Sequence, residues 1–148
     1  MIHIQTENFN VDEQYQQLAQ HPQAGAIVFF VGSVRDMNEH QPVSELFLEH
    51  YPKMTDQVLQ GLVKEAYKRW SLVDIRIIHR IGLLKVNEQI VFVGVGAHHR
   101  RDAFEAAEFL MDQLKTKAPF WKKETRLGQS HWLDQRDCDQ NAVKRWSH

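Results

Sequence analysis

Residues 102–126 have the sequence DAFEAAEFLMDQLKTKAPFWKKETR, in which a helical pattern is followed by a break and then by a strand-like segment. Pro119 disfavours helical geometry at the residue before it and cannot donate a backbone hydrogen bond, so the helix must end near Lys117. The helix predicted over 102–117 has one apolar face that we expect to be buried, formed by Phe104, Ala107, Leu110, Met111 and Leu114.

Further strands and helices are predicted outward from this stretch. Apolar or alternating runs predict strands at 24–34 (buried), 43–51, 73–77 (ending near Gly82), 89–96 after a turn near Asn87, 120–126 and 130–133. Helices are expected after the caps Asn10 and Thr55, the latter running to about Trp70, and from Asp137 or Asp139 to Trp146. Because these elements mix without strict βαβ repetition, we expect an α+β fold with a largely antiparallel sheet.

Length and composition exclude several classes of protein. The 148 residues suit one domain spanning 1–148, and a net charge of −1 argues against a general nucleic-acid coat. The single cysteine, Cys138, excludes an internal disulfide and a thiolate zinc site. The apolar runs are too short to span a bilayer, and the first ten residues lack the basic start and apolar stretch of a signal peptide. We therefore expect a cytoplasmic protein with no membrane segment.

Ser33, Val34 and Arg35 follow Gly32 at the exit of the first buried strand. Small residues followed by a cation can let a ligand approach backbone amides while the guanidinium presents a forked donor. The alternative is a simple strand end with a solvated arginine, which this tetrapeptide taken alone favours.

The sequence His98-His99-Arg100-Arg101 lies directly before the helix over 102–117. Free N–H groups and the helix dipole make such a position suitable for an anion, although Asp102 and Glu105 could satisfy that end instead. Metal binding is the weaker interpretation, because no His-x-x-x-His pair is present, and we predict no metal site.

Residues 115–126 contain five basic residues and one acidic residue. Lys115 belongs to the last helical turn, where a cation suits the dipole whether or not it has another role. The break at Pro119 could fold the chain back and bring Lys122 into one pocket with Lys115. Grouped cations lower the pKa of a lysine, which lets its amine act as acid, base or nucleophile near neutral pH. The neighbouring Phe120 could form a wall of such a pocket, but core packing explains it equally well.

Glu49 and His50 form a further candidate pair for proton transfer. Their side chains point to opposite faces if both lie in a strand, so a structural connection is favoured there. The sequence has no Walker loop, dinucleotide-binding glycine fingerprint or nucleophile elbow.

Taken in order, these segments resemble the large, catalytic subunit of molybdopterin synthase. The matching blocks extend over roughly residues 24–146: FVGSVR (30–35), LEHYPKM (48–54), HRIG (79–82), HHRRDAFEA (98–106), LKTKAPFWKKE (114–124) and the terminal DQ and KRW. LKTKAPFWKKE together with FVGSVR is the specific part. His98 is a departure, since a less basic residue is expected there, and the His-Arg match favours His99 as the residue that faces the ligand.

The resemblance implies a fold, a reaction and partners. The fold is an α/β hammerhead, and the reaction converts cyclic pyranopterin monophosphate into molybdopterin by adding dithiolene sulfurs. The sulfur donor is the C-terminal Gly-Gly thiocarboxylate of a small ubiquitin-like subunit, and the large subunits dimerise to give a 2:2 complex. No cofactor and no protein-bound metal are implied.

The resemblance also assigns site residues. Lys115 and Lys122 become the catalytic pair, handling proton transfers and developing negative charge. Substrate binding falls on Ser33, Val34, Arg35, His99, Arg100, Lys115, Lys122, Lys123 and Glu124, with Arg136 contributed by the neighbouring subunit. Arg35, His99 and Arg100 are expected to hold the phosphate and pterin end.

Two other functions compete with this interpretation. A non-catalytic scaffold could bind a ubiquitin-like protein through the basic groove, but it would not need the phosphate-binding end. A nucleic-acid-binding α+β domain could use HHRR and KTKAPFWKK, and it would show steeply salt-dependent binding. The near-neutral net charge counts against the second.

Overall fold

The computed structural model describes residues 1–38, 40–126, 128–133 and 137–147. In chain order the elements are β1 (Ile2–Gln5), α1 (Val11–Ala19), β2 (Ala26–Ser33), β3 (Met37–Asn38), β4 (Gln41–Pro42), β5 (Glu45–His50), α2 (Pro52–Arg69), β6 (Leu72–Arg80), β7 (Gly82–Lys85), β8 (Gln89–Ala97), α3 (Arg100–Lys117), β9 (Phe120–Arg126), β10 (Gln129–Trp132) and α4 (Asp137–Lys144). None of the helices in these ranges is long and apolar enough to cross a membrane.

The strands form two four-stranded sheets and one small hairpin. The first sheet has the order β1-β6-β8-β2, the second has the order β10-β9-β5-β7, and β3 pairs with β4. Every pairing is antiparallel except that of β1 with β6. This confirms the expected α+β class with largely antiparallel sheets.

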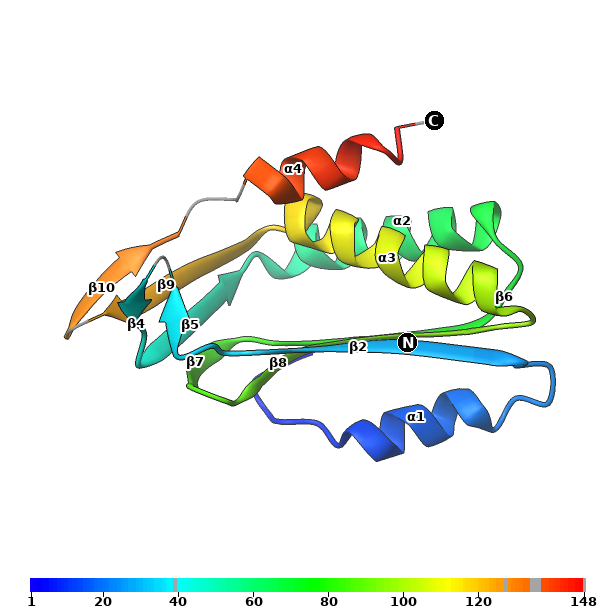
Figure 1. Ribbon diagram of the computed structural model, residues 1–148, viewed down its shortest axis with the longest axis horizontal. Coiled ribbons are helices and arrows are strands. Elements are labelled where there is room, and N and C mark those ends of the chain that lie inside the picture. Colours follow the sequence, from blue (N-terminus) through cyan, green and yellow to red (C-terminus); the bar gives the residue numbers. More distant parts are fainter. Residues whose placement is uncertain (39, 127, 134–136, 148) are drawn as a thin grey trace.

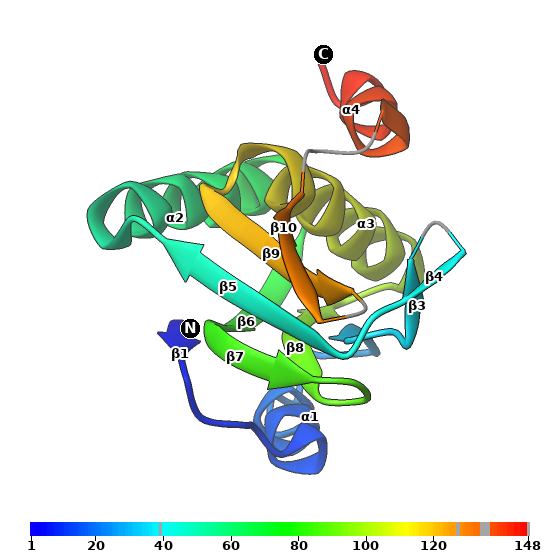
Figure 2. The ribbon, with the colours of Figure 1, turned by 90° about the vertical axis from the view of Figure 1, so that its left-hand side faces the viewer.

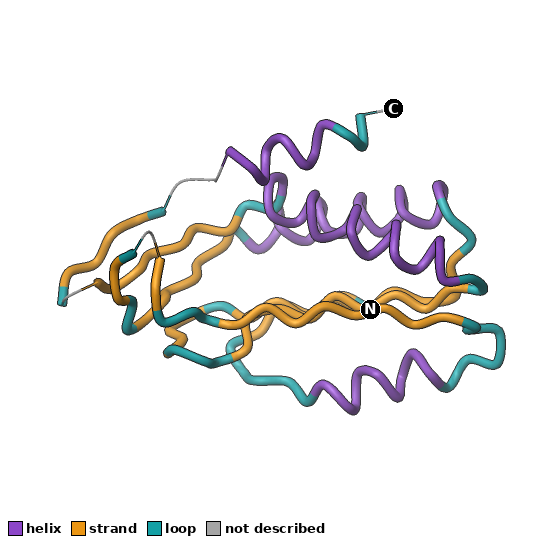
Figure 3. The backbone as a smooth tube through the Cα atoms, in the orientation of Figure 1, coloured by secondary structure: helices purple, strands orange, loops and turns teal. Residues whose placement is uncertain are grey.

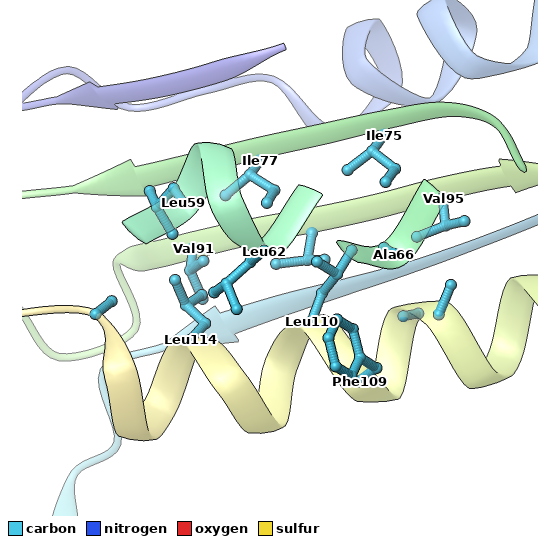
Figure 4. Packing of buried hydrophobic residues seen from close by; sticks show 14 residues of the cluster. Leu59, Leu62, Ala66, Ile75, Ile77, Val91, Val95, Phe109, Leu110 and Leu114 are labelled. Carbon is cyan, nitrogen blue, oxygen red and sulfur yellow. The ribbon is translucent and has the colours of Figure 1, made fainter. Parts of the chain in front are cut away.

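The first sheet is covered by helices on both faces (Figure 1). On one face α2 and α3 pack against alternate residues of β6 and β8, and Figure 4 shows Ile75 and Ile77 facing Leu62 and Leu110. On the other face Leu18 of α1 packs against Ile78 and Phe92. Because successive strand residues point to opposite faces, one run of apolar residues builds both clusters.

Gly94 of β8 allows α1 to approach the sheet closely. A Cβ added at this position would lie 2.7 Å from Leu18 Cδ1 and 2.7 Å from the Phe92 ring. Only glycine avoids these clashes, so this residue fixes how near the helix lies to the strand.

The second sheet continues from one end of the first sheet and extends beyond the helices that cover the first sheet (Figure 3). Seen from that end, β5, β9 and β10 lie across the ends of β6 and β8, with β7 below them (Figure 2). One face of this sheet carries Leu46, Leu48 and Leu84, which form a separate buried cluster with Val34. Phe47, Trp121 and Trp132 are among the exposed large apolar residues.

Several local predictions are confirmed. Asn10 caps α1, its Oδ1 accepting a bond of 3.0 Å from the Glu13 backbone N–H. Helix α3 ends at Lys117, and Ala118 before Pro119 is extended with ψ of 130°. Asn87 has the left-handed φ of 72° that the predicted turn requires.

Other local predictions are wrong. Helix α2 begins at Pro52, because proline suits the first helical position, so Thr55 is not its cap. Thr55 is instead fully buried inside the helix, with Oγ1 3.3 Å from His50 Nδ1. Phe104 is 62% exposed, because α3 turns Ala103 and Ala106 toward the sheet. The strand expected over 24–34 is not a buried one, because β2 lies at the edge of its sheet and exposes Phe29 and Phe30. Strands β1, β3, β4 and β7 were not predicted; all are short.

Candidate active site

A cavity of about 550 Å³ lies where the two sheets meet. Its walls come from the ends of β2 and β6, the start of β8, the C-terminal turn of α3, and the inward faces of β5 and β9, with β3 at its rim. The polar side chains that line it belong to Ser33, Arg35, Asn38, His79, Lys115, Lys122 and Glu124. Elements far apart in the sequence therefore place three cations, one carboxylate and one imidazole around a single space.

Lys115 and Lys122 reach this cavity from opposite sides of the Pro119 break. Lys115 lies in the last turn of α3, and Lys122 is the third residue of β9. Alternation along β9 puts Lys122 on the same face as Phe120, which also lines the cavity. As predicted from the break at Pro119, the two lysines lie at one pocket.

The β2 exit contributes residues of two different kinds. Arg35 is exposed at the cavity, which suits a guanidinium that receives an anion. Val34 is buried to 4% exposure, its N–H donates to Glu88 O (3.0 Å), and its carbonyl accepts from Asn87 N–H (2.9 Å). The Val34 amide is therefore used by the turn before β8, and its side chain packs in the core while bordering the cavity.

Glu124 is held by neighbouring residues of the protein. It is 3% exposed, and Asn38 Nδ2 donates to both carboxylate oxygens, at 2.7 and 3.0 Å. Arg126 Nη2 donates to Glu124 Oε1 at 3.1 Å and forms a buried ion pair with it. These bonds tie the β3–β4 hairpin to β9, so Glu124 shapes the rim of the cavity.

His79 forms part of the cavity wall at the end of β6. It is 5% exposed, and its ring stacks on Phe120 with centroids 3.8 Å apart and planes 11° apart. Its Nδ1 lies 2.8 Å from Arg80 O, a carbonyl that can only accept, so Nδ1 carries the proton. Burial, followed by the nearby charges of Lys122 and Lys115, lowers the pKa of His79 to about 3.

Lys123 does not line the cavity, although the sequence grouped it with Lys122 and Glu124. Neighbouring residues of a strand point to opposite faces, so three consecutive residues cannot share one pocket. Lys123 lies on the outer face of β9, with Nζ 5.6 Å from the Trp132 ring centroid. Its expected direct role in substrate binding does not fit this chain taken alone.

His99 and Arg100 are also far from the cavity within one chain. His99 caps α3 and Arg100 is its first residue, whereas Lys115 lies in its last turn, and the sixteen helical residues from 100 to 115 extend about 24 Å. Both are exposed. His98 Nδ1 lies 3.1 Å from Ser71 Oγ, so this imidazole has a partner within the chain. The expectation that Arg35, His99 and Arg100 form one phosphate site is therefore not met in a single chain.

The geometry has clear chemical consequences. The cavity cations Arg35, Lys115 and Lys122 can neutralise an anionic substrate, and two amines at one pocket can transfer protons. Among the described residues, no three His, Cys, Asp or Glu side chains gather as a metal ion would require. Arg136 lies outside the described residues.

Comparison with known proteins identifies the family of this chain. The family model described as MoaE protein matches residues 4–117. The chain is 52% identical over 145 residues to the molybdopterin synthase catalytic subunit of Vibrio cholerae, covering 98% of this chain and 97% of that protein. The subunit of the same name from Escherichia coli K12 is 49% identical over 138 residues, covering 93% and 92%. The chain belongs to the MoaE family.

Solved structures show that the MoaE fold extends over the full length of this chain. The molybdopterin biosynthesis MoaE protein of Burkholderia ambifaria superposes with a TM-score of 0.85 at 45% identity, covering 100% of this chain and 98% of that one. Molybdopterin synthase from Staphylococcus aureus gives a TM-score of 0.82 at 31% identity, covering 89% and 96%. The resemblance inferred from the motifs is confirmed.

Sequence reasoning missed two polar residues that line this cavity, His79 and Asn38. His79 could have been found, because it continues the alternation of Ile75 and Ile77 and so must lie on the same buried face. A histidine at the end of an apolar strand face indicates that a polar site borders the core at that point. Asn38 gives no comparable pattern, since its contact with Glu124 joins residues 86 positions apart.

Proposed function

We propose that this chain is the catalytic subunit of a cytoplasmic molybdopterin synthase, which adds dithiolene sulfurs to cyclic pyranopterin monophosphate. The single observation that carries this proposal is the meeting of Lys115, Lys122 and Arg35 at one cavity in a MoaE chain. A substrate phosphate and a thiocarboxylate are both anions, so one pocket that receives them needs several fixed cations.

Each cation has a distinct place in the proposed reaction. Arg35, at the mouth beside β2, would hold the substrate phosphate through its forked N–H groups. Lys115 of α3 and Lys122 of β9 would transfer protons and stabilise negative charge as sulfur adds to the pterin side chain. Glu124 would act indirectly, since its oxygens are bonded to Asn38 and Arg126.

A second copy of the chain would complete the phosphate-binding end. His99 and Arg100 lie about one helix length from Lys115, so they can serve this pocket only if another copy presents them there. Strand β2 is the edge of the first sheet and borders the cavity. A homodimer formed along that side would place the α3 start of one copy near the pocket of the other, and Arg136 is proposed to contribute in the same way.

The sulfur donor in this proposal is a small ubiquitin-like subunit with a thiocarboxylated Gly-Gly tail. A tail without side chains can enter a narrow groove as an extended segment and reach the lysines. Binding of one small subunit to each copy of the chain would give a 2:2 complex.

Reconstitution tests the proposal directly. The purified chain, the thiocarboxylated small subunit and cyclic pyranopterin monophosphate should together yield molybdopterin. Deleting the two terminal glycines of the small subunit should abolish product and only partly weaken association, because the globular contacts remain. Light scattering should give a homodimer alone and a 2:2 complex with the partner. A chain that binds the small subunit without forming product would be a scaffold rather than the enzyme.

A further inference from the structure

His79 is held in place on two sides. One face of the imidazole lies flat on Phe120, and Nδ1–H donates to the carbonyl of Arg80 in its own strand. That strand end is itself fixed, because the Arg80 guanidinium donates to Thr6 O and to Gln89 O. The ring therefore has one orientation, and Nε2 is its remaining polar atom.

The imidazole is neutral at pH values well above 3. Its pKa of about 3 results from burial and then from the nearby lysine ammonium groups. With Nδ1 protonated, a neutral ring has a lone pair on Nε2. The wall of a strongly cationic cavity thus contains a fixed acceptor that adds no charge of its own.

Strand geometry places Lys122 on the same face of β9 as Phe120, the residue on which His79 stacks. Phe120 and Lys122 are two residues apart in β9 and share its inward face, and the ring of His79 covers Phe120. The ammonium charges of Lys122 and Lys115 both oppose protonation of His79, and that of Lys122 does so more strongly. The three side chains of His79, Phe120 and Lys122 therefore form one wall of the cavity.

We propose that His79 is a positioning residue of the sulfur-transfer site, whose Nε2 accepts a hydrogen bond from the Lys122 ammonium and aims it into the cavity. This role rests on the proposed function of Lys122. A flexible lysine has many rotamers, and a rigid acceptor beside it selects one of them. His79 does not contact the reacting atoms; it acts through the lysine.

An NMR experiment on the isolated chain tests the contact without any enzyme assay. Nitrogen-15 spectra of the imidazoles should show His79 as the Nδ1-protonated tautomer. Lys122→Met should move its Nε2 resonance toward the position of a nitrogen that accepts no hydrogen bond. Lys115→Met is the matched control, because it removes an equal charge from the same cavity, and it should move that resonance less. Equal shifts in both variants would overturn the proposed contact.

Kinetics of a matched pair of variants tests the positioning role. His79→Gln keeps an acceptor near the Nε2 position, whereas His79→Asn keeps the donor to Arg80 O and loses that acceptor. We expect kcat to fall about tenfold to a hundredfold in His79→Asn, with KM for the pterin substrate changed less than about threefold, and His79→Gln to retain most of kcat. Equal kcat values in the two variants would contradict the proposal.

A double variant separates positioning from a general structural effect. If His79 acts through Lys122, His79→Asn should cause no further loss of kcat in a Lys122→Ala background. The control is His50→Asn, because His50 stacks on the same Phe120, at 6.0 Å, without lining the cavity, and it should leave kcat within about threefold of the unsubstituted chain. Multiplicative losses in the double variant would refute the positioning role. If the unsubstituted chain makes no product, the proposed function fails, and the NMR result still decides the contact.

Discussion

The first sheet, β1-β6-β8-β2, is enclosed by helices, whereas the second, β10-β9-β5-β7, has one face turned to the cavity and the other exposed (Figures 1 and 3). Phe92, Val93 and Val95 of β8 are fully buried, but Trp121 of β9 and Trp132 of β10 are at least half exposed. The two sheets have the same number of strands and mostly the same kind of pairing, so pairing alone does not set their roles.

This difference separates the residues that stabilise the fold from those that are available for chemistry. The enclosed sheet buries apolar residues on both faces and contributes mainly to folding. The half-covered sheet alternates, so that Lys122 faces the cavity while Lys123 lies over Trp132 outside. The charged side chains lie around the cavity where the two sheets meet. The first sheet is packed on both faces and is therefore rigid, and the second sheet has positions that can carry polar residues.

The largest expected effect is on catalysis, and it compares two neighbouring lysines. Lys122→Ala or Lys115→Ala should lower product formation by about a hundredfold to ten-thousandfold, the contribution typical of acid–base groups. The fold should persist, because both side chains line the cavity and neither belongs to the apolar core. Lys123→Ala is the control and should retain most activity. Full activity with both cavity lysines replaced would remove them from the mechanism.

The next effect compares one phenylalanine from each sheet. Phe92→Ala should lower the free energy of unfolding by about 3–5 kcal/mol, because it leaves a cavity between α1 and the first sheet. Phe47→Ala, on the exposed face of the second sheet, should cost about 1 kcal/mol. Urea denaturation measures both. Similar losses would show that the second sheet contributes as much to stability as the first.

The third effect concerns substrate affinity, and it compares Arg35 at the cavity with Arg100 at the start of α3. Arg35→Ala and Arg100→Ala should each weaken binding of the pterin phosphate by about 1.5–3 kcal/mol, or roughly tenfold to a hundredfold, and affect the small subunit less. Calorimetry provides both affinities. Unchanged affinity in Arg35→Ala would move the phosphate away from this cavity, and a loss confined to Arg35→Ala would argue against a contribution of Arg100 from a second copy.

The last effect is a dependence of stability on pH that originates at His79. Its pKa of about 3 in the folded chain lies below the ordinary value of 6.5, so the unfolded chain binds the proton more readily. This contribution is complete above pH 6.5 and is lost as pH falls toward 3, by up to about 1.4 kcal/mol per pH unit. His79→Gln should flatten that slope in urea denaturation at about pH 6, 5 and 4. Identical slopes would contradict the buried neutral state.

Much of the fold was predictable because its determinants are local. The helix end at Lys117 follows from Pro119, and the α1 cap follows from Asn10. The error at Phe104 has a physical cause: an apolar periodicity defines a wide stripe, and only packing decides which edge of it is buried. Strand β1 has four residues and depends on pairing with β6, so it has no strong local pattern.

Part of the candidate site was predictable from residue types, but its arrangement was not. Lys115, Lys122, Arg35 and Glu124 were recognised from motifs, and the structure places these four at one cavity. The separation of His99 and Arg100 from that cavity could not be inferred from order along the chain. Their helix places them at the other end of the first sheet.

By itself the sequence determined the α+β class, the break at Pro119, the two lysines and membership of the MoaE family, because each depends on residue types at short spacing. Only the tertiary structure decided that Lys123 faces outward, that Asn38 and Arg126 hold Glu124, and that His79 is buried in the wall of the cavity that Lys122 also lines. These features depend on strand register and on contacts between residues tens of positions apart. Burial then changes the protonation of a side chain in a way that no local pattern specifies.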